Sequence, residues 1–240
     1  MPSPDESETV VQVYSTDNAI DKYTEMNEFG LYEAEAKLVD RYFQPRTARV
    51  LDVACGAGRT TKPLAVTGYD VVGIDISNEM ASKAKSVIPG TEVCVSDASS
   101  LPFRDESFDF VLFSYVNIDL LYPRAQRLRA LREMNRVLKR GGLLLFGTSN
   151  SLHVVPALFQ NRDHLRRFYV RNDNYRRLFR AYKKDPDEWG LNSYFGTQPR
   201  TLWDLRRCGF RTEHVGGARD SLLRFLEKVQ YYVARKSQDV

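Results

Sequence analysis

The sequence predicts an α/β fold with a mostly parallel sheet and helices on both faces. Short apolar runs rich in β-branched residues recur along the chain, as in strands that are buried on both faces. Helical patterns separate these runs, and this alternation is typical of a parallel sheet with right-handed crossovers. The predicted strands are residues 48–54, 69–77, 91–97, 108–116 and 142–149.

Two of the intervening helices have clear sequence signals. Residues 78–88 follow Ser77, which is a suitable N-cap, and place Met80 and Ala84 four positions apart. Residues 124–142 carry a stripe of apolar side chains and a basic last turn, with Gly141 as the expected C-cap. The stripe consists of Leu128, Leu131, Met134 and Leu138.

Composition limits the possible classes of protein. The 240 residues are 42% hydrophobic and 28% charged, which is ordinary for a globular chain. No apolar run approaches the roughly 20 residues that span a bilayer, and the acidic N-terminus does not resemble a signal peptide. Three widely spaced cysteines favour neither disulfides nor a metal site. We therefore expect a cytoplasmic protein without metal.

Charge is distributed unevenly along the chain. Residues 1–150 hold 17 basic and 21 acidic side chains, whereas residues 151–240 hold 18 and 10. The segment 162–184 contains nine Lys or Arg residues interleaved with Tyr and Phe. Such a segment could face an anion, including RNA, or it could be a helix whose arginines are simply solvated.

Polar residues and glycines follow the first three predicted strands. Gly56 and Gly58 allow a ligand to lie against the main chain, and Asp52 before them can hold an ammonium group. Asp75, at the end of the second strand, is placed to accept from ribose hydroxyls, and Asp97 can accept from an exocyclic amine. These groups suit a ligand with an ammonium, a ribose and an adenine: S-adenosyl-L-methionine (SAM). Alternatively, Asp52 and Asp75 each cap the helix that follows.

Four stretches in this order resemble the class I SAM-dependent methyltransferases, and most closely the methyltransferase type 11 family. They are VLDVACGAGRTTKPLA, VVGIDISNEMASKAK, SDASSLPFRDESFDFVLFSYVN and LREMNRVLKRGGLLLF. The resemblance implies a Rossmann-like, seven-stranded sheet whose last strand is antiparallel, with FRTEHVGG and VQYYVARKS as strands six and seven. It also implies domain limits at 1–45 (a helical lid), 46–150 (the SAM-binding core), 151–198 (an inserted helical cap) and 199–240 (the end of the core sheet).

The resemblance also implies individual roles. Gly56, Gly58 and Asp52 would line the methionine moiety, Arg59 would reach its carboxylate, and the Ser114 carbonyl would face its ammonium. The cofactor-binding candidates are Asp52, Ala54, Gly56, Gly58, Arg59, Asp75, Ile76, Asp97, Ala98 and Ser114. The acceptor-binding candidates are Tyr14, Tyr115, Asn117, His153, Arg167 and Tyr194, with His153 also the candidate general base.

Three functions remain open from the sequence. The first is methyl transfer from SAM to a small molecule, with Tyr14, Tyr23 and Phe29 closing over the cofactor. The second is methylation of tRNA or another nucleic acid bound by the basic segment 162–184. The third is a SAM-binding regulator without catalysis. No Asn-Pro-Pro-Tyr-like motif follows the fourth strand, which argues against the enzymes that methylate amino groups of DNA bases.

Overall fold

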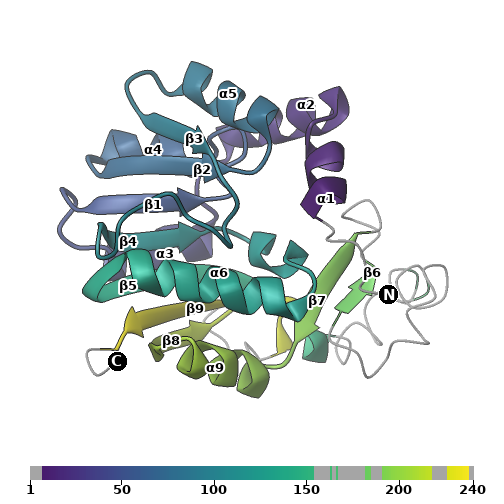
Figure 1. Cartoon of the computed structure of the whole chain (residues 1–240). Coiled ribbons are helices and arrows are strands. Elements are labelled where there is room, and N and C mark those ends of the chain that lie inside the picture. The colour runs from purple at the N-terminus through teal and green to yellow at the C-terminus, as the bar shows by residue number, and fades with distance from the viewer. Residues whose placement is uncertain are drawn as a thin grey trace.

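The computed structural model describes residues 7–153, 163, 166, 182–184, 191–217 and 226–237. Helices cover both faces of a mixed, mostly parallel sheet, so the expected α/β class is confirmed (Figure 1). The helices are α1 (Ser7–Tyr14), α2 (Asp17–Glu25), η1 (Met26–Glu28), α3 (Glu33–Tyr42), α4 (Thr61–Thr67), α5 (Asn78–Val87), η2 (Asn117–Leu120), α6 (Arg124–Val137), η3 (Ser151–His153) and α9 (Gln198–Arg207). The strands are β1 (Arg49–Val53), β2 (Asp70–Asp75), β3 (Glu92–Val95), β4 (Phe108–Phe113), β5 (Leu138–Asn150), β6 (Tyr182–Lys184), β7 (Asn192–Gly196), β8 (Phe210–Gly216) and β9 (Val229–Lys236).

The order of the strands brings the carboxyl ends of the first four to one edge. Strands β3, β2, β1, β4 and β5 are neighbours in that order, and all of them run parallel. Strand β9 pairs antiparallel with β5, and β8 pairs antiparallel with β9. The stretches expected as strands six and seven therefore form β8 and β9, with the predicted antiparallel end. In open parallel sheets, this carboxyl edge is where ligands bind.

The described sheet has nine strands, two more than the seven expected. The additional pair, β6 and β7, comes from the insertion after β5. Residues Ser149 and Asn150 of β5 pair with β7 beyond the last residue that pairs with β4. The described part of the insertion thus holds a β-hairpin, and most of the helical cap expected there falls outside the described residues.

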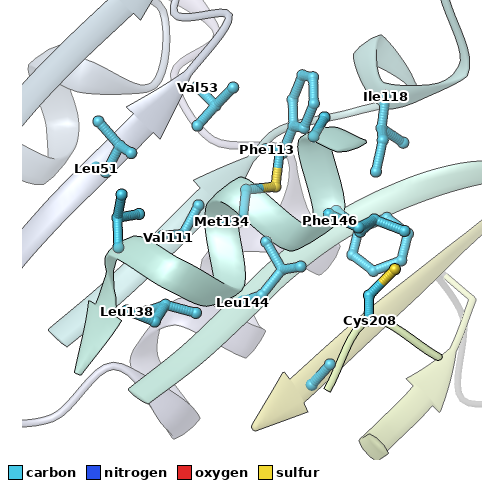
Figure 2. Packing of buried hydrophobic residues seen from close by; sticks show 14 of the residues in the cluster. Leu51, Val53, Val111, Phe113, Ile118, Met134, Leu138, Leu144, Phe146 and Cys208 are labelled. Carbon is cyan, nitrogen blue, oxygen red and sulfur yellow. The ribbon is translucent and has the colours of Figure 1, made fainter. Parts of the chain in front are cut away.

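Alternating side chains of the strands build a core on each face of the sheet. Leu51, Val111 and Leu144 pack in one cluster with Met134 of α6 (Figure 2). Leu205 of α9 belongs to the same cluster. On the other face, the intervening strand residues pack against α3 and α4. This second cluster includes Val50, Leu112, Leu145, Leu38, Val39, Phe43 and Leu64. Helix α3 is therefore part of the core of the fold.

Both helices predicted with clear signals are present, but the second is shorter than expected. In α5, the Ser77 side chain accepts a hydrogen bond from the Met80 N–H, as predicted for an N-cap. Helix α6 ends at Val137, because Leu138 is already extended and pairs with Phe108 of β4. The expected C-cap at Gly141 is therefore wrong.

A buried ion pair fixes the turn η2 between β4 and α6. Asp119 is fully buried and accepts from the Arg127 guanidinium at 2.9 Å. It also accepts from the Thr148 hydroxyl at 2.5 Å and from the Ser149 N–H at 2.6 Å. Arg127 lies 4.2 Å from the ring centroid of Tyr194 in β7. These contacts join the turn, the helix α6 and the inserted hairpin.

Candidate cofactor and acceptor cleft

An open cleft lies at the carboxyl ends of β1 to β4, beneath α1 and α2. It encloses about 1150 Å³ of empty space, part of it open to solvent. Most of the residues predicted from the sequence line it, but Asp52, Gly58 and Tyr194 do not. The predicted residues that line the cleft are Tyr14, Ala54, Gly56, Arg59, Asp75, Ile76, Asp97, Ala98, Ser114, Tyr115 and Asn117.

The turn after β1 is tied to the end of β2. Gly56 has a φ of 56°, which favours glycine, and its N–H donates to Asp75 at 2.8 Å. The other oxygen of Asp75 accepts from the Ser77 N–H at 2.9 Å. Burial raises the pKa of Asp75, although the N–H donors of Ser77 and Gly56 oppose the rise. A Cβ on Gly56 would meet no atom within 4 Å, so this backbone faces open space.

The structure places Asp52 and Gly58 behind the cleft wall. Asp52 is fully buried, and the hydroxyls of Thr60 and Thr61 both donate to it at 2.6 Å. It therefore secures the start of α4 through two side-chain hydroxyls, without capping a backbone N–H of the helix, and it does not line the cleft. A Cβ on Gly58 would lie 2.8 Å from the Ile88 side chain, so this glycine permits close packing of α5.

The buried Asp52 makes the stability of the protein depend on pH. Burial raises its pKa from 3.8 to about 6, against hydrogen bonds from Thr60 and Thr61. The folded protein therefore binds a proton more tightly than the unfolded chain, so this group destabilises the fold as pH rises from 4 through about 6. The difference in free energy of unfolding between Asp52→Asn and the wild type is therefore expected to shift in favour of the variant by about 2 kcal/mol from pH 4 to pH 7. Urea denaturation at several pH values measures this difference.

Asp109→Asn is the matched control for this prediction. Hydrogen bonds from Lys139 and the Arg49 N–H outweigh partial burial and lower the pKa of Asp109. Its contribution is therefore nearly constant above about pH 5, and its substitution should shift the free energy of unfolding almost equally at each pH above that value. Parallel curves for the wild type and Asp52→Asn would contradict the prediction.

The third strand supplies the far end of the cleft. Asp97 follows β3, and one of its oxygens accepts from the Ser99 N–H at 2.7 Å. Ile76 and Ala98 line the same part of the cleft. An aspartate beside apolar side chains and main chain can accept from an amine while the apolar groups pack on a ring.

A network of polar side chains that the sequence did not reveal lies at the end of β4. Glu35 of α3 is fully buried and accepts from the Ser114 hydroxyl at 2.6 Å and from the Tyr115 N–H at 2.7 Å. Arg59 donates to Ser114, to the Gly30 carbonyl at 2.5 Å and to Glu35 at 3.4 Å. Arg59 is therefore held in place at the cleft wall.

Tyr115 has a strained backbone in this cleft. Its φ is 53°, a value that side-chain-bearing residues seldom adopt. Among the described residues other than glycine, only two more have a positive φ. One of these, Ala54, also lines the cleft. A Cβ on Gly147 would lie 2.4 Å from the Tyr115 carbonyl oxygen, so the glycine makes room for this conformation. Strain of this kind is concentrated at functional sites.

The acceptor-binding candidates are placed differently from one another. Tyr14, Tyr115 and Asn117 line the cleft. Tyr194 is instead fully buried against Arg127, because its ring packs between the inserted hairpin and the core. His153 ends η3, but its side chain lies outside the described part, so its role as a base stays a prediction.

Arg167 also lies outside the described residues, as does most of the basic segment 162–184. Of the aromatic residues expected to close over the cofactor, Tyr14 and Tyr23 line the cleft, with ring centroids 5.6 Å apart. Phe29 is 71% exposed and does not. Tyr32 and Tyr122, which were not predicted, contribute two further rings to the wall.

Two absences hold within the part of the chain that the structure describes. No three His, Cys, Asp or Glu side chains there are grouped so that they could hold a metal ion. No helix of the described ranges is both long and apolar enough to cross a membrane.

Comparison with known proteins relates the chain to methyltransferases. Residues 51–146 match the profile of a protein family described as a methyltransferase domain. The chain is 32% identical over 149 residues to the uncharacterized protein MJ1123 of Methanocaldococcus jannaschii, which covers 62% of this chain and 66% of that protein. It is 42% identical over 97 residues to a demethylmenaquinone methyltransferase of Renibacterium salmoninarum, which covers 40% of this chain and 39% of that protein. The chain thus spans less than two thirds of the length of these curated relatives.

A solved structure extends the likeness over most of the fold. A SAM-dependent methyltransferase of Methanosarcina mazei superposes with a TM-score of 0.65 at 25% identity, covering 87% of this chain and 99% of that one. The family profile covers β1 to β5, the strands whose carboxyl ends form the cleft. Residues 51–146 therefore form a class I SAM-dependent methyltransferase domain, whose cofactor is S-adenosyl-L-methionine.

Proposed function

We propose that the protein transfers the methyl group of SAM to a small acceptor with a largely apolar or aromatic surface. The observation that supports this proposal is a single cleft with one part lined by charged side chains and main chain and another lined by aromatic and apolar side chains. Its first part holds Asp75, Asp97 and Arg59 beside bare main chain. Its second part is walled by tyrosines, leucines and an amide: Tyr14, Tyr23, Tyr32, Tyr115, Tyr122, Leu120, Leu121 and Asn117.

The first part fits the cofactor. Asp75 is proposed to accept from the ribose hydroxyls, and Asp97, Ala98 and Ile76 to surround the adenine. The exposed backbone at Gly56 and the neighbouring Ala54 would lie against the methionine moiety. The Ser114 carbonyl would face its ammonium and Arg59 its carboxylate. Asp52 and Gly58 would support this surface indirectly, by fixing the turn and its packing on α5.

The second part supplies the acceptor site in this proposal. The tyrosine rings offer flat apolar surface with polar edges, which suits an aromatic or hydroxylated small molecule. One relative is named for a quinone acceptor, demethylmenaquinone. The sulfonium of SAM supplies an activated methyl group, so the residues of this chain have chiefly to bind and align the two partners. Alignment of this kind can contribute roughly 7–11 kcal/mol.

The test uses the purified protein with methyl-labelled SAM and three fractions of a cell extract: organic-soluble small molecules, total RNA and protein. We expect label in the organic-soluble fraction, together with formation of S-adenosylhomocysteine. Label confined to RNA would instead support the nucleic-acid alternative. Binding of SAM without label in any fraction would support a regulator. Binding of a nicotinamide cofactor in place of SAM would overturn the proposal.

A further inference from the structure

Glu35 connects three segments of the chain at the wall of the cleft. Its carboxylate is fully buried, and every partner that the structure describes for it is a donor. These donors are the N–H of Tyr32 at 3.0 Å, the N–H of Tyr115 at 2.7 Å, the hydroxyl of Ser114 at 2.6 Å and the guanidinium of Arg59 at 3.4 Å. A carboxylate is the one side-chain group that can accept from all of them at once.

We propose that Glu35 is a positioning residue that fixes Arg59 and Tyr115 at the end of the cleft that takes the amino-acid part of the cofactor. The inference rests on the proposed function, since it assigns SAM to this cleft. Glu35 itself does not line the cleft, and it acts through two residues that do.

Arg59 is held on several sides. Its guanidinium donates to Gly30, Ser114 and Glu35, and it lies 4.3 Å from the ring centroid of Tyr32. The side chain of Arg59 is 11% exposed and that of Glu35 is 1% exposed. A buried guanidinium requires a nearby negative charge, and Glu35 supplies it. The pair thereby presents an aligned cation to the cleft.

Tyr115 is constrained from both ends of its backbone. Glu35 accepts its N–H, and Gly147 leaves room for its carbonyl oxygen. Without the carboxylate, this N–H would lose its acceptor on Glu35, and the left-handed conformation would be less well stabilised against the more favourable regions of the backbone map. The Tyr115 side chain would then move relative to Ser114 and Arg59.

The position of Glu35 in α3 explains how it stays in place. Leu38 and Val39, one turn further along, are buried against the sheet. The segment before the helix carries Gly30 and Tyr32, which contact Arg59 directly. Glu35 therefore links α3, which packs on the sheet, to the segment that joins η1 to α3.

The test is Glu35→Gln, with Glu133→Gln as the matched control. An amide places its NH₂ group against donors in either orientation, so it cannot replace the carboxylate at Glu35. Glu133 likewise accepts from a backbone N–H, that of Leu101 at 2.9 Å, and from Arg136 at 2.7 Å. It lies on α6 outside the cleft lining. Both variants thus replace a carboxylate that accepts from a backbone N–H and an arginine, but only the Glu35 network adjoins the cleft.

Calorimetry with two ligands locates the effect. S-adenosylhomocysteine carries the amino-acid part, whereas methylthioadenosine has the same nucleoside without it. We expect Glu35→Gln to weaken binding of S-adenosylhomocysteine at least tenfold and binding of methylthioadenosine less than twofold. Glu133→Gln should change neither by more than twofold. Equal loss of both ligands in Glu35→Gln, or loss of neither, overturns the inference.

Two further measurements keep the outcome clear. If Glu35→Gln does not fold by circular dichroism, Ser114→Ala replaces it, because it removes only the hydroxyl between Glu35 and Arg59. The same selective loss is expected there, with at least a threefold change, and its absence overturns the inference. If the wild-type protein binds neither ligand, the proposed function itself fails. If the wild-type protein binds both ligands, but the variant does not lose S-adenosylhomocysteine affinity selectively, only the proposed role of Glu35 is rejected and the proposed function stands.

Discussion

Asp75→Ala is expected to weaken the binding of S-adenosylhomocysteine by about 3 kcal/mol, roughly 100-fold. In the proposed complex, this carboxylate accepts hydrogen bonds from the ribose hydroxyls. It also orients the main chain of the cleft, because the N–H groups of Gly56 and Ser77 donate to its two oxygens. The alanine variant loses both functions. Isothermal titration calorimetry gives the change in dissociation constant.

Asp70→Ala is the control, since Asp70 begins the same strand at the opposite edge of the sheet. Its partner is Arg49 at 3.3 Å, and the Asp70 side chain is 66% exposed, so this substitution should leave ligand binding unchanged. Asp75→Asn separates the two functions of Asp75, because it keeps an acceptor for one N–H while removing the charge. Wild-type affinity in Asp75→Ala would show that the ribose lies elsewhere.

The position of Asp75 illustrates which parts of the site the sequence could predict. Val71, Val72 and Ile74 in β2 are buried on alternating faces, so the strand is visible as an apolar run. An aspartate that ends such a run must lie at the carboxyl edge of the sheet. The same argument placed Asp97, and the order of the runs gave the parallel core. These predictions depend only on local patterns.

Glu35 shows why the rest of the site could not be predicted. Its partners Ser114 and Tyr115 are 79 and 80 residues away in sequence, so the contact exists only in the folded chain. One signal was present: Glu35 shares a helical face with Leu38 and Val39, where a charge requires partners. The pattern could not name those partners.

Asp52 and Leu138 show a second limit, the choice between two local outcomes. Asp52 is the last residue but one of β1, whereas Asp75 ends β2, and the hydroxyls of Thr60 and Thr61 hold the Asp52 carboxylate in the interior. Leu138 continues the apolar stripe of a helix, yet it pairs with Phe108 and begins β5. In each case a tertiary contact decides between alternatives that the sequence leaves open.

The second large effect concerns the buried pair Asp119 and Arg127. Asp119→Ala should lower the free energy of unfolding by about 3–5 kcal/mol at pH 7.5, because it leaves a charged guanidinium buried without its carboxylate. Arg127 is 1% exposed and has no other carboxylate within 4 Å among the described residues. The loss is a large fraction of the stability of a typical domain. Urea denaturation measures it.

The exposed pair of Lys37 and Glu33 provides the comparison. Both side chains are more than 60% exposed, at 64% and 79%. Glu33→Ala should therefore change the free energy of unfolding by only about 0.5 kcal/mol or less. A loss of similar size in Asp119→Ala would mean that water reaches Arg127 and that the pair is not buried in solution.

The double variant Asp119→Leu, Arg127→Met tests whether charge itself is the cause. Apolar side chains of similar volume remove both buried charges together, and such replacements are often neutral for stability. We expect the double variant to recover most of the stability that Asp119→Ala loses. It should not recover the geometry of η2, because the Thr148 hydroxyl and the Ser149 N–H would still lack their acceptor. Asn117 and Leu120 of this turn line the cleft. A double variant with restored stability but altered turnover of the acceptor would therefore show that the Asp119–Arg127 pair maintains the shape of the acceptor site.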